Sequence, residues 1–135
     1  MRLLSFLLLA TAALAQAPQF QPVGSISQLM VNIIYPTSDA MFYIERNPPK
    51  TEVEWNLIRN QALMLAESGN LLMLPTRVRE GEWTKDAKAL VDVGAAVYKA
   101  AVAKDMDGIL ALSEQLTAAC INCHTKYHPA YQKKR

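Results

Sequence analysis

Residues 109–124 read ILALSEQLTAACINCH and join a helical pattern to a cluster of sulfur and imidazole side chains. Apolar residues recur at three- and four-residue intervals, which places them on one face of a helix. Both cysteines of the chain continue that face, which comprises Ile109, Leu112, Leu116, Ala119, Cys120 and Cys123. His124 follows the second cysteine directly. This stretch therefore predicts a helix whose last turns carry the chemistry of the protein.

The sequence Cys120-Ile121-Asn122-Cys123-His124 has the form C-x-x-C-H, which is expected for covalent attachment of haem. Two thiols three residues apart lie about one turn apart on the same face of a helix, so both can reach the vinyl groups on one porphyrin edge and form thioethers. The imidazole of the adjacent histidine can then bind the iron. The motif therefore predicts one haem c attached through Cys120 and Cys123, with His124 as the proximal iron ligand.

Three other interpretations of such closely spaced cysteines are a structural disulfide, a redox-active dithiol and a zinc site. A disulfide over C-x-x-C closes a very small loop and contributes little stability. A redox-active dithiol normally lies at the start of a helix that follows a strand. Zinc needs two further ligands, and His128 is the one His or Cys that remains outside the motif. Haem attachment is favoured over all three.

The N-terminus, MRLLSFLLLATAALAQA, has the features of a cleaved secretory signal peptide. Arg2 precedes an apolar run over residues 3–9 that is too short for a permanent membrane span. We expect cleavage after Ala15, with Ala17 as the second candidate and an uncleaved anchor as the alternative. Haem attachment of this type is completed outside the cytoplasm, so the motif and the signal peptide both predict a periplasmic protein.

After the signal peptide, residues 1–15, the chain predicts one soluble domain with one core. Its 51% hydrophobic and 19% charged residues are an ordinary globular balance. We expect an N-terminal extension over residues 16–24, a haem-binding domain over 25–131 and a basic tail over 132–135. The net charge of the mature chain is about +1, which gives no support for nucleic-acid binding, and no later apolar stretch predicts membrane insertion.

Four helical segments account for most of this domain, and none alternates in the manner of a strand. The first begins at Ser25, whose S-x-x-Q sequence is a capping box, contains a kink at Pro36 and ends before Asn47. The second begins at Thr51, in a T-x-x-E capping box, and ends before Pro75.

The third and fourth helices follow the longest predicted loop, residues 75–83. Thr84 is the expected N-cap of the third helix, in which Gly94 is unfavourable unless a neighbour packs closely against it. A break at residues 104–107 leads into the fourth helix, which ends near Pro129. Four helices of this length with mostly short connections favour an all-α fold, an antiparallel four-helix bundle in up-down-up-down order.

In these features the chain resembles the cytochrome c′ family, also called class II c-type cytochromes. Members of that family carry a C-x-x-C-H motif near the C-terminus of the last helix of a four-helix bundle. In class I cytochromes c the motif lies near the N-terminus and a Met ligand follows it, whereas here the motif ends at His124 of 135 residues. The resemblance covers essentially the whole mature chain, although only the haem motif is sharply specific. It implies a cytochrome c′-like bundle with one haem c.

Members of that family differ in what lies on the distal side of the iron, a position supplied by the first half of the first helix. Low-spin relatives place a methionine there, and Met30 falls at about that position in this sequence. The resemblance therefore implies Met30 as the sixth ligand, with Met41 as the next candidate and an open site after that. A thioether opposite a histidine raises the reduction potential and suits electron transfer.

The expected function is therefore that of a periplasmic electron carrier, not an enzyme, which exchanges electrons with periplasmic redox proteins. The alternative is a five-coordinate cytochrome c′ that binds nitric oxide or carbon monoxide. Members of the family are often dimers through their first two helices, so a homodimer is a candidate assembly.

Three further side chains are candidates for secondary roles. His128 stands where the family commonly has Arg or Lys; we expect an exposed helix-end residue because Pro129 follows it, with tuning of the iron as the alternative. Arg77 and Arg79 in the long loop are candidates for pairing with haem propionates, since guanidinium groups match carboxylate geometry. The family offers no firm match at these two positions.

Overall fold

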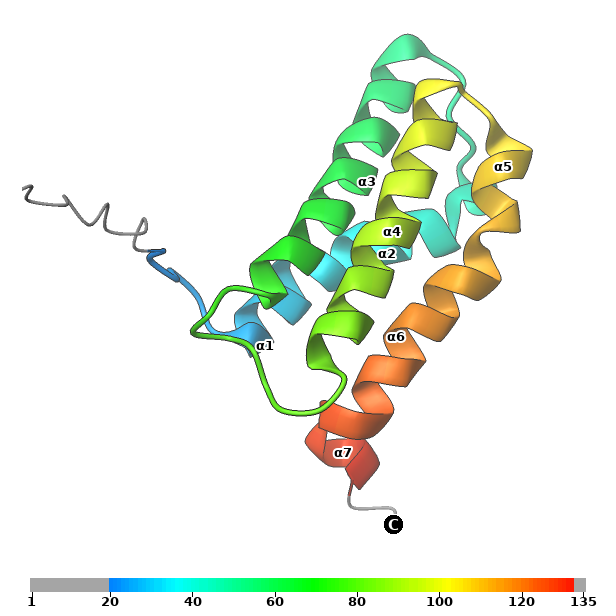
Figure 1. The fold of residues 1–135 in the computed structure, drawn as a ribbon. Helices are drawn as coiled ribbons and strands as arrows, with labels where there is room; N and C mark the ends of the chain where they lie inside the picture. The colour runs from blue at the N-terminus through cyan, green and yellow to red at the C-terminus, as the bar shows by residue number, and fades with distance from the viewer. Residues whose placement is uncertain (1–19, 133–135) are drawn as a thin grey trace, which may run out of the picture.

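The computed structural model describes residues 20–132, so the predicted signal peptide over 1–15 and most of the basic tail lie outside the described range. Within residues 20–132 every regular element is helical and there is no strand, which confirms the prediction of an all-α fold. The helices pack together as a bundle (Figure 1). In chain order the elements are α1 (Ile26–Leu29), a π-helical turn (Met30–Ile34), α2 (Tyr35–Phe42), a 3₁₀ turn (Ile44–Arg46), α3 (Glu52–Leu72), α4 (Trp83–Val102), α5 (Met106–Ala111), α6 (Ser113–Tyr127) and α7 (Pro129–Gln132).

The predicted first helix is divided into α1, the π-helical turn and α2. The predicted capping box is present: the Gln28 N–H donates to Ser25 Oγ at 3.2 Å, and the Ser25 N–H donates to Gln28 Oε1 at 2.9 Å. Pro36 has no N–H to donate and lies near the start of α2, directly after the π-helical turn, in which the Tyr35 N–H donates to the Met30 carbonyl. Such turns are frequent at functional sites.

The second predicted capping box is also present, at the start of α3. The Thr51 N–H donates to Glu54 Oε2 at 2.8 Å, and the Glu54 N–H donates to Thr51 Oγ1 at 3.3 Å. Backbone hydrogen bonds from Lys50 and Thr51 lower the pKa of the Glu54 carboxyl, so the carboxylate of the cap stays charged to lower pH than that of an ordinary glutamate. The helix ends at Leu72, before Pro75 as predicted.

α3 and α4 lie side by side along the bundle (Figure 1). Their backbones come into close contact where Gly94 of α4 meets Ala66 of α3. A Cβ added at Gly94 would lie 2.8 Å from the Ala66 Cα, which is shorter than any ordinary contact. This confirms that Gly94 has the closely packed neighbour that its place in mid-helix requires.

The predicted N-cap of the next helix is wrong. α4 begins at Trp83, so Thr84 lies inside the helix, and Glu82 at the N-cap position makes no side-chain cap. The reason is tertiary: the buried Trp83 indole donates from Nε1 to the carbonyl of Leu72 at 2.8 Å, which fixes the start of α4 against the end of α3.

The predicted fourth helix begins after a break and is interrupted once. Lys104 has a positive φ of 55° in the break, and Asp105 caps α5 by accepting a hydrogen bond from the Gly108 N–H at 2.8 Å. Leu112 then separates α5 from α6, an interruption that the periodicity did not predict. α6 ends at Tyr127 with extended backbone at His128, as expected for a residue before proline.

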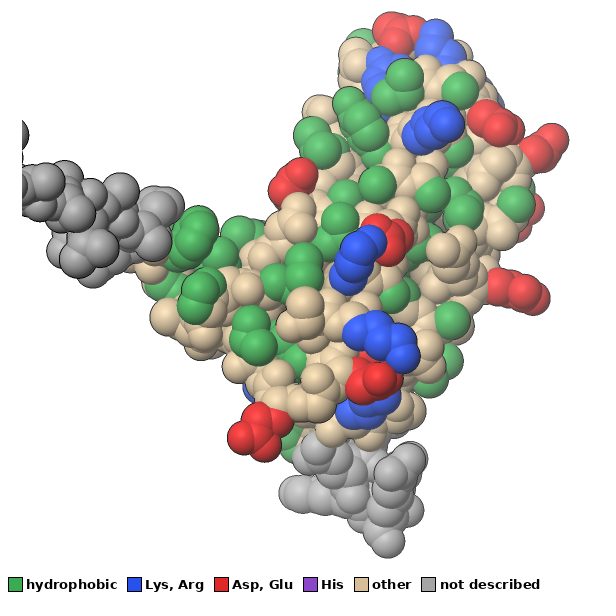
Figure 2. Space-filling view, viewed as in Figure 1, with side chains coloured by type: hydrophobic (Ala, Val, Ile, Leu, Met, Phe, Trp, Pro, Cys, Tyr) green, Lys and Arg blue, Asp and Glu red, His purple; other side chains and the backbone are tan. Residues whose placement is uncertain are grey.

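The face of the bundle shown in Figure 2 carries basic and acidic side chains in an interspersed arrangement. Two ion pairs lie in or directly before α4: Lys88 with Asp92 at 2.6 Å, and Lys85 with Glu82 at 3.1 Å. Of the helices within residues 20–132, none has both the length and the apolar character needed to cross a membrane.

Candidate haem-binding site

A cavity of about 660 Å³, hereafter the main cavity, lies between the first helical segment, α4 and α6. Its walls come from residues 30–43, from residues 86–90 at the start of α4 and from residues 119–124 of α6, with Leu72 and His128 completing the lining. Its volume falls within the range of about 300–1,000 Å³ that is typical of small-molecule and cofactor sites. Most of the lining side chains are apolar, among them Ile34, Phe42 and Leu90.

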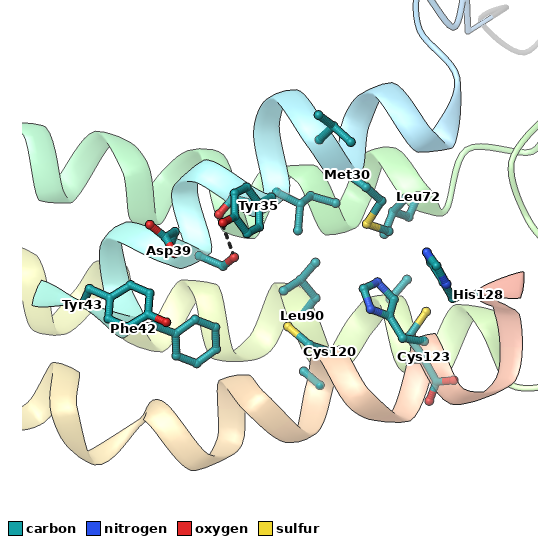
Figure 3. Close-up of a pocket in the computed structure, with 17 residues that line it drawn as sticks. Met30, Tyr35, Asp39, Phe42, Tyr43, Leu72, Leu90, Cys120, Cys123 and His128 are labelled. Atoms are coloured by element: carbon teal, nitrogen blue, oxygen red, sulfur yellow. Dashed lines mark hydrogen bonds between the residues drawn. The ribbon is translucent and has the colours of Figure 1, made fainter. Parts of the chain in front are cut away.

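Both cysteines and the adjacent histidine of the sequence motif line one wall of this cavity. Cys120 and Cys123 project from the same face of α6 (Figure 3). Cys123 is buried, Cys120 and His124 are half-buried, and both thiols are free. The structure therefore brings the three predicted site residues to one apolar surface.

Met30 lines the same cavity from the π-helical turn, on an element different from that of the cysteines (Figure 3). Its side chain is half-buried. Met41, the other methionine considered for the sixth position, is 2% exposed and packs in the core, outside the lining of the main cavity. Of these two candidates, the fold places only Met30 across the cavity from α6.

Burial governs the protonation of the motif side chains. Burial raises the pKa of the Cys120 thiol, and burial together with the nearby Asp86 carboxylate raises the pKa of Cys123 to about 11. Redox-active dithiols have lowered thiol pKa values instead, so this environment does not suit that alternative. Burial, followed by the charge of His128, lowers the pKa of His124 and favours the neutral imidazole, the form that binds metals.

A zinc site finds no support in the arrangement of possible ligands. Among the described residues, 20–132, no group of three or more His, Cys, Asp and Glu side chains is arranged to hold a metal ion. His128 lies one turn beyond the motif with its ring centroid 5.4 Å from that of His124. It is exposed, as expected for a helix-end residue, and its Nδ1 accepts a hydrogen bond from the Ala130 N–H at 3.2 Å.

An ion pair beside the motif was not predicted from the sequence. Lys126 Nζ donates to both carboxylate oxygens of Asp86, at 2.9 and 3.0 Å, and joins α6 to α4. Asp86 is 6% exposed and lines the main cavity, and its hydrogen bond is the main cause of the raised pKa of Lys126. The one signal in the sequence that could have indicated this ion pair was Asp86, an acidic residue at the start of the otherwise apolar face of α4.

A smaller hollow of about 160 Å³, hereafter the side pocket, adjoins the main cavity. The two share five lining residues, which are Met30, Val31, Cys123, His124 and His128. Arg79 lines the side pocket. Arg77 does not: its guanidinium is buried and donates to the carbonyls of Leu71 at 3.0 Å and Gly24 at 2.8 Å, beside a separate hollow. Arg77 is therefore committed to the fold and is not a propionate partner.

The donor set fits a covalently attached porphyrin. Two thiols one helical turn apart could bond two vinyl groups, the apolar walls suit a macrocycle, and an imidazole and a thioether on separate elements could each bind iron. Comparisons with protein-family models, with curated proteins and with solved structures found no match. The assignment of the site therefore depends on the residues and their arrangement.

Proposed function

We propose that this chain is an exported mono-haem c-type cytochrome of the cytochrome c′ kind that acts in electron transfer. One observation carries the proposal: both cysteines, His124 and Met30 line a single, mostly apolar cavity large enough for a cofactor. The antiparallel, up-down-up-down order of a four-helix bundle and the periplasmic location are parts of the same proposal. So is exchange of electrons with periplasmic redox proteins.

Each side chain has a distinct role in this proposal. Cys120 and Cys123 would hold the haem through thioether bonds, and His124 and Met30 would bind its iron. Bound in this way, the haem supplies a one-electron ferric/ferrous couple. Leu90 and Phe42, which line the cavity, exclude water from the site. The cysteines and His124 lie on one helix, α6, which sets their relative positions.

The test is to express the full chain with its signal peptide in a bacterium that matures c-type cytochromes, and to purify it from the periplasm. The expected product carries one covalently bound haem, detected by the pyridine haemochrome spectrum and by intact mass. Purified, folded protein without covalent haem would contradict the proposal.

Replacing Met30 with leucine is expected to convert a low-spin, six-coordinate spectrum into a high-spin one. Leucine nearly conserves the volume but provides no sulfur ligand, so packing is retained while the sixth ligand is lost. The reduction potential should fall by roughly 0.1 V, a fraction of the approximately 0.8 V range that axial ligands span. Ferric and ferrous optical spectra and a redox titration measure both changes.

The matched control is Met41→Leu, which makes the same substitution in the core and should leave the spectrum low-spin. An unchanged low-spin spectrum in Met30→Leu would show that another residue binds the iron. A wild-type protein that is already high-spin and binds carbon monoxide rapidly would instead favour the five-coordinate, gas-binding alternative.

A further inference from the structure

The main cavity and the side pocket differ in the charges that line them. Asp39 lies in the wall of the main cavity toward the end of α2, and the carboxylate of Asp86 lies in the wall formed by α4. The side pocket is lined by one guanidinium, Arg79, and by no carboxylate of the described residues. The joined hollow therefore has an acidic part and a basic part.

The two cysteines differ in which of the two spaces they line. Cys120 lines only the main cavity, whereas Cys123 lines both spaces. Arg79 lines only the side pocket, and its charge is near enough to lower the pKa of the Cys123 thiol against the effect of burial. Arg79 therefore lies on the Cys123 side of the motif.

Arg79 is held at the side pocket by a set of contacts between the loop 73–82 and the end of α6. Its guanidinium lies 5.0 Å above the Trp83 ring and donates to the Tyr127 carbonyl at 3.3 Å. The Tyr127 hydroxyl donates to the Glu80 carbonyl at 2.8 Å, and the rings of Trp83 and Tyr127 meet edge to face with centroids 4.9 Å apart. Gly81, with φ of 79°, supplies the turn that brings the loop against Tyr127.

Arg79 has hydrogen-bonding capacity beyond these contacts. A guanidinium has five N–H donors, and one hydrogen bond to the protein is present. No carboxylate of residues 20–132 lies within ion-pair distance of Arg79. A positioned, unneutralised guanidinium beside a cofactor cavity is suited to bind a carboxylate of the ligand.

We propose that Arg79 pairs with a propionate of the haem, so that this carboxylate lies at the side pocket. The pairing rests on the proposed function, since it requires a bound haem. It selects one of the two arginines of the loop as the partner of the haem. It also gives the loop 73–82 a function, which is to hold a cation against the cofactor.

The test compares Arg79→Gln with the wild type in the purified, haem-loaded full chain. Loss of the cation stabilises the ferric state, so the equilibrium constant for reduction should fall by up to about fivefold, as fits a partly exposed ion pair. The propionate-bending band of the resonance Raman spectrum should shift, because the carboxylate loses a hydrogen-bond donor. Arg79→Lys, which keeps the charge, should restore most of the reduction equilibrium.

Two control variants separate the proposed contact from other effects. Arg46→Gln removes an equal charge from a guanidinium that lies 3.8 Å above the Tyr43 ring, beside the main cavity, and should leave the reduction equilibrium unchanged. Tyr127→Phe removes the hydrogen bond to Glu80 but keeps the cation, and should leave the Raman band in place.

The possible results distinguish this inference from the proposed function. Covalent haem in all variants with no change in Arg79→Gln would overturn the pairing and leave the cytochrome assignment intact. Equal effects in Arg46→Gln or Tyr127→Phe would also overturn it, because net charge or loop position would then explain the change. Absence of haem from the wild type would overturn both.

Discussion

Replacing Cys120 and Cys123 together with serine is expected to abolish covalent haem attachment completely. Serine nearly conserves the shape of each side chain, but a hydroxyl does not form the thioether that the motif requires. Each single variant keeps one thiol on the cavity wall and should retain a weaker, singly attached haem. Intact mass after extraction with acidified acetone, which removes unattached haem, measures the difference between the variants.

The control for this experiment lies between the two cysteines. Ile121 is 50% exposed, and Ile121→Ser introduces the same hydroxyl within the motif without removing a thiol. This variant should keep full covalent haem. Haem that stays attached in the double serine variant would show that other residues hold it, and the interpretation of the motif would be wrong.

The parts of the fold that were predicted correctly depend on contacts between residues close in sequence. The capping boxes at Ser25 and Thr51 need partners three residues away, and both are present. The start of α4 was mispredicted because its position depends on the hydrogen bond from Trp83 to Leu72, eleven residues back on another helix. A capping residue such as Thr84 gives no information about that contact.

In the candidate site too, the features that were predicted are local in sequence and those that were missed depend on distant contacts. The C-x-x-C-H motif is local, so the sequence identified the three residues that the structure brings to one wall of the main cavity. The contacts of Lys126 with Asp86 and of Arg79 with Tyr127 join residues 40 and 48 positions apart, and no periodicity predicts them. The structure also separates Arg77, which is buried in contacts with the main chain, from Arg79.

Replacing Gly94 with leucine is expected to destabilise the bundle by about 3 kcal/mol, the upper part of the range for overpacking a core. The reason is that the obstacle is backbone: a Cβ at this position would lie 2.8 Å from both the Cα and the N of Ala66. A rotamer change cannot relieve that contact, so α3 and α4 must separate. Urea unfolding followed by circular dichroism measures the change in the free energy of unfolding.

Alanine at the same position is the more discriminating substitution, because helix propensity and packing predict changes of opposite sign in the free energy of unfolding. Propensity alone would make Gly94→Ala stabilising by about 1 kcal/mol. The contact with Ala66 should outweigh that gain and leave the variant less stable by about 1 kcal/mol. Ala95→Gly, at the exposed neighbouring position, measures how much the difference in helix propensity between alanine and glycine contributes to stability in the same helix.

Stabilisation by Gly94→Ala would show that α3 and α4 can separate at no cost, contrary to the close packing. The site depends on this packing, since residues 86–90 at the start of α4 form one wall of the main cavity. Moving α4 away from α3 would shift Asp86 relative to Lys126 and displace the wall opposite Met30. We therefore expect the leucine variant to bind haem less completely as well as to unfold more easily, although Gly94 does not line the cavity.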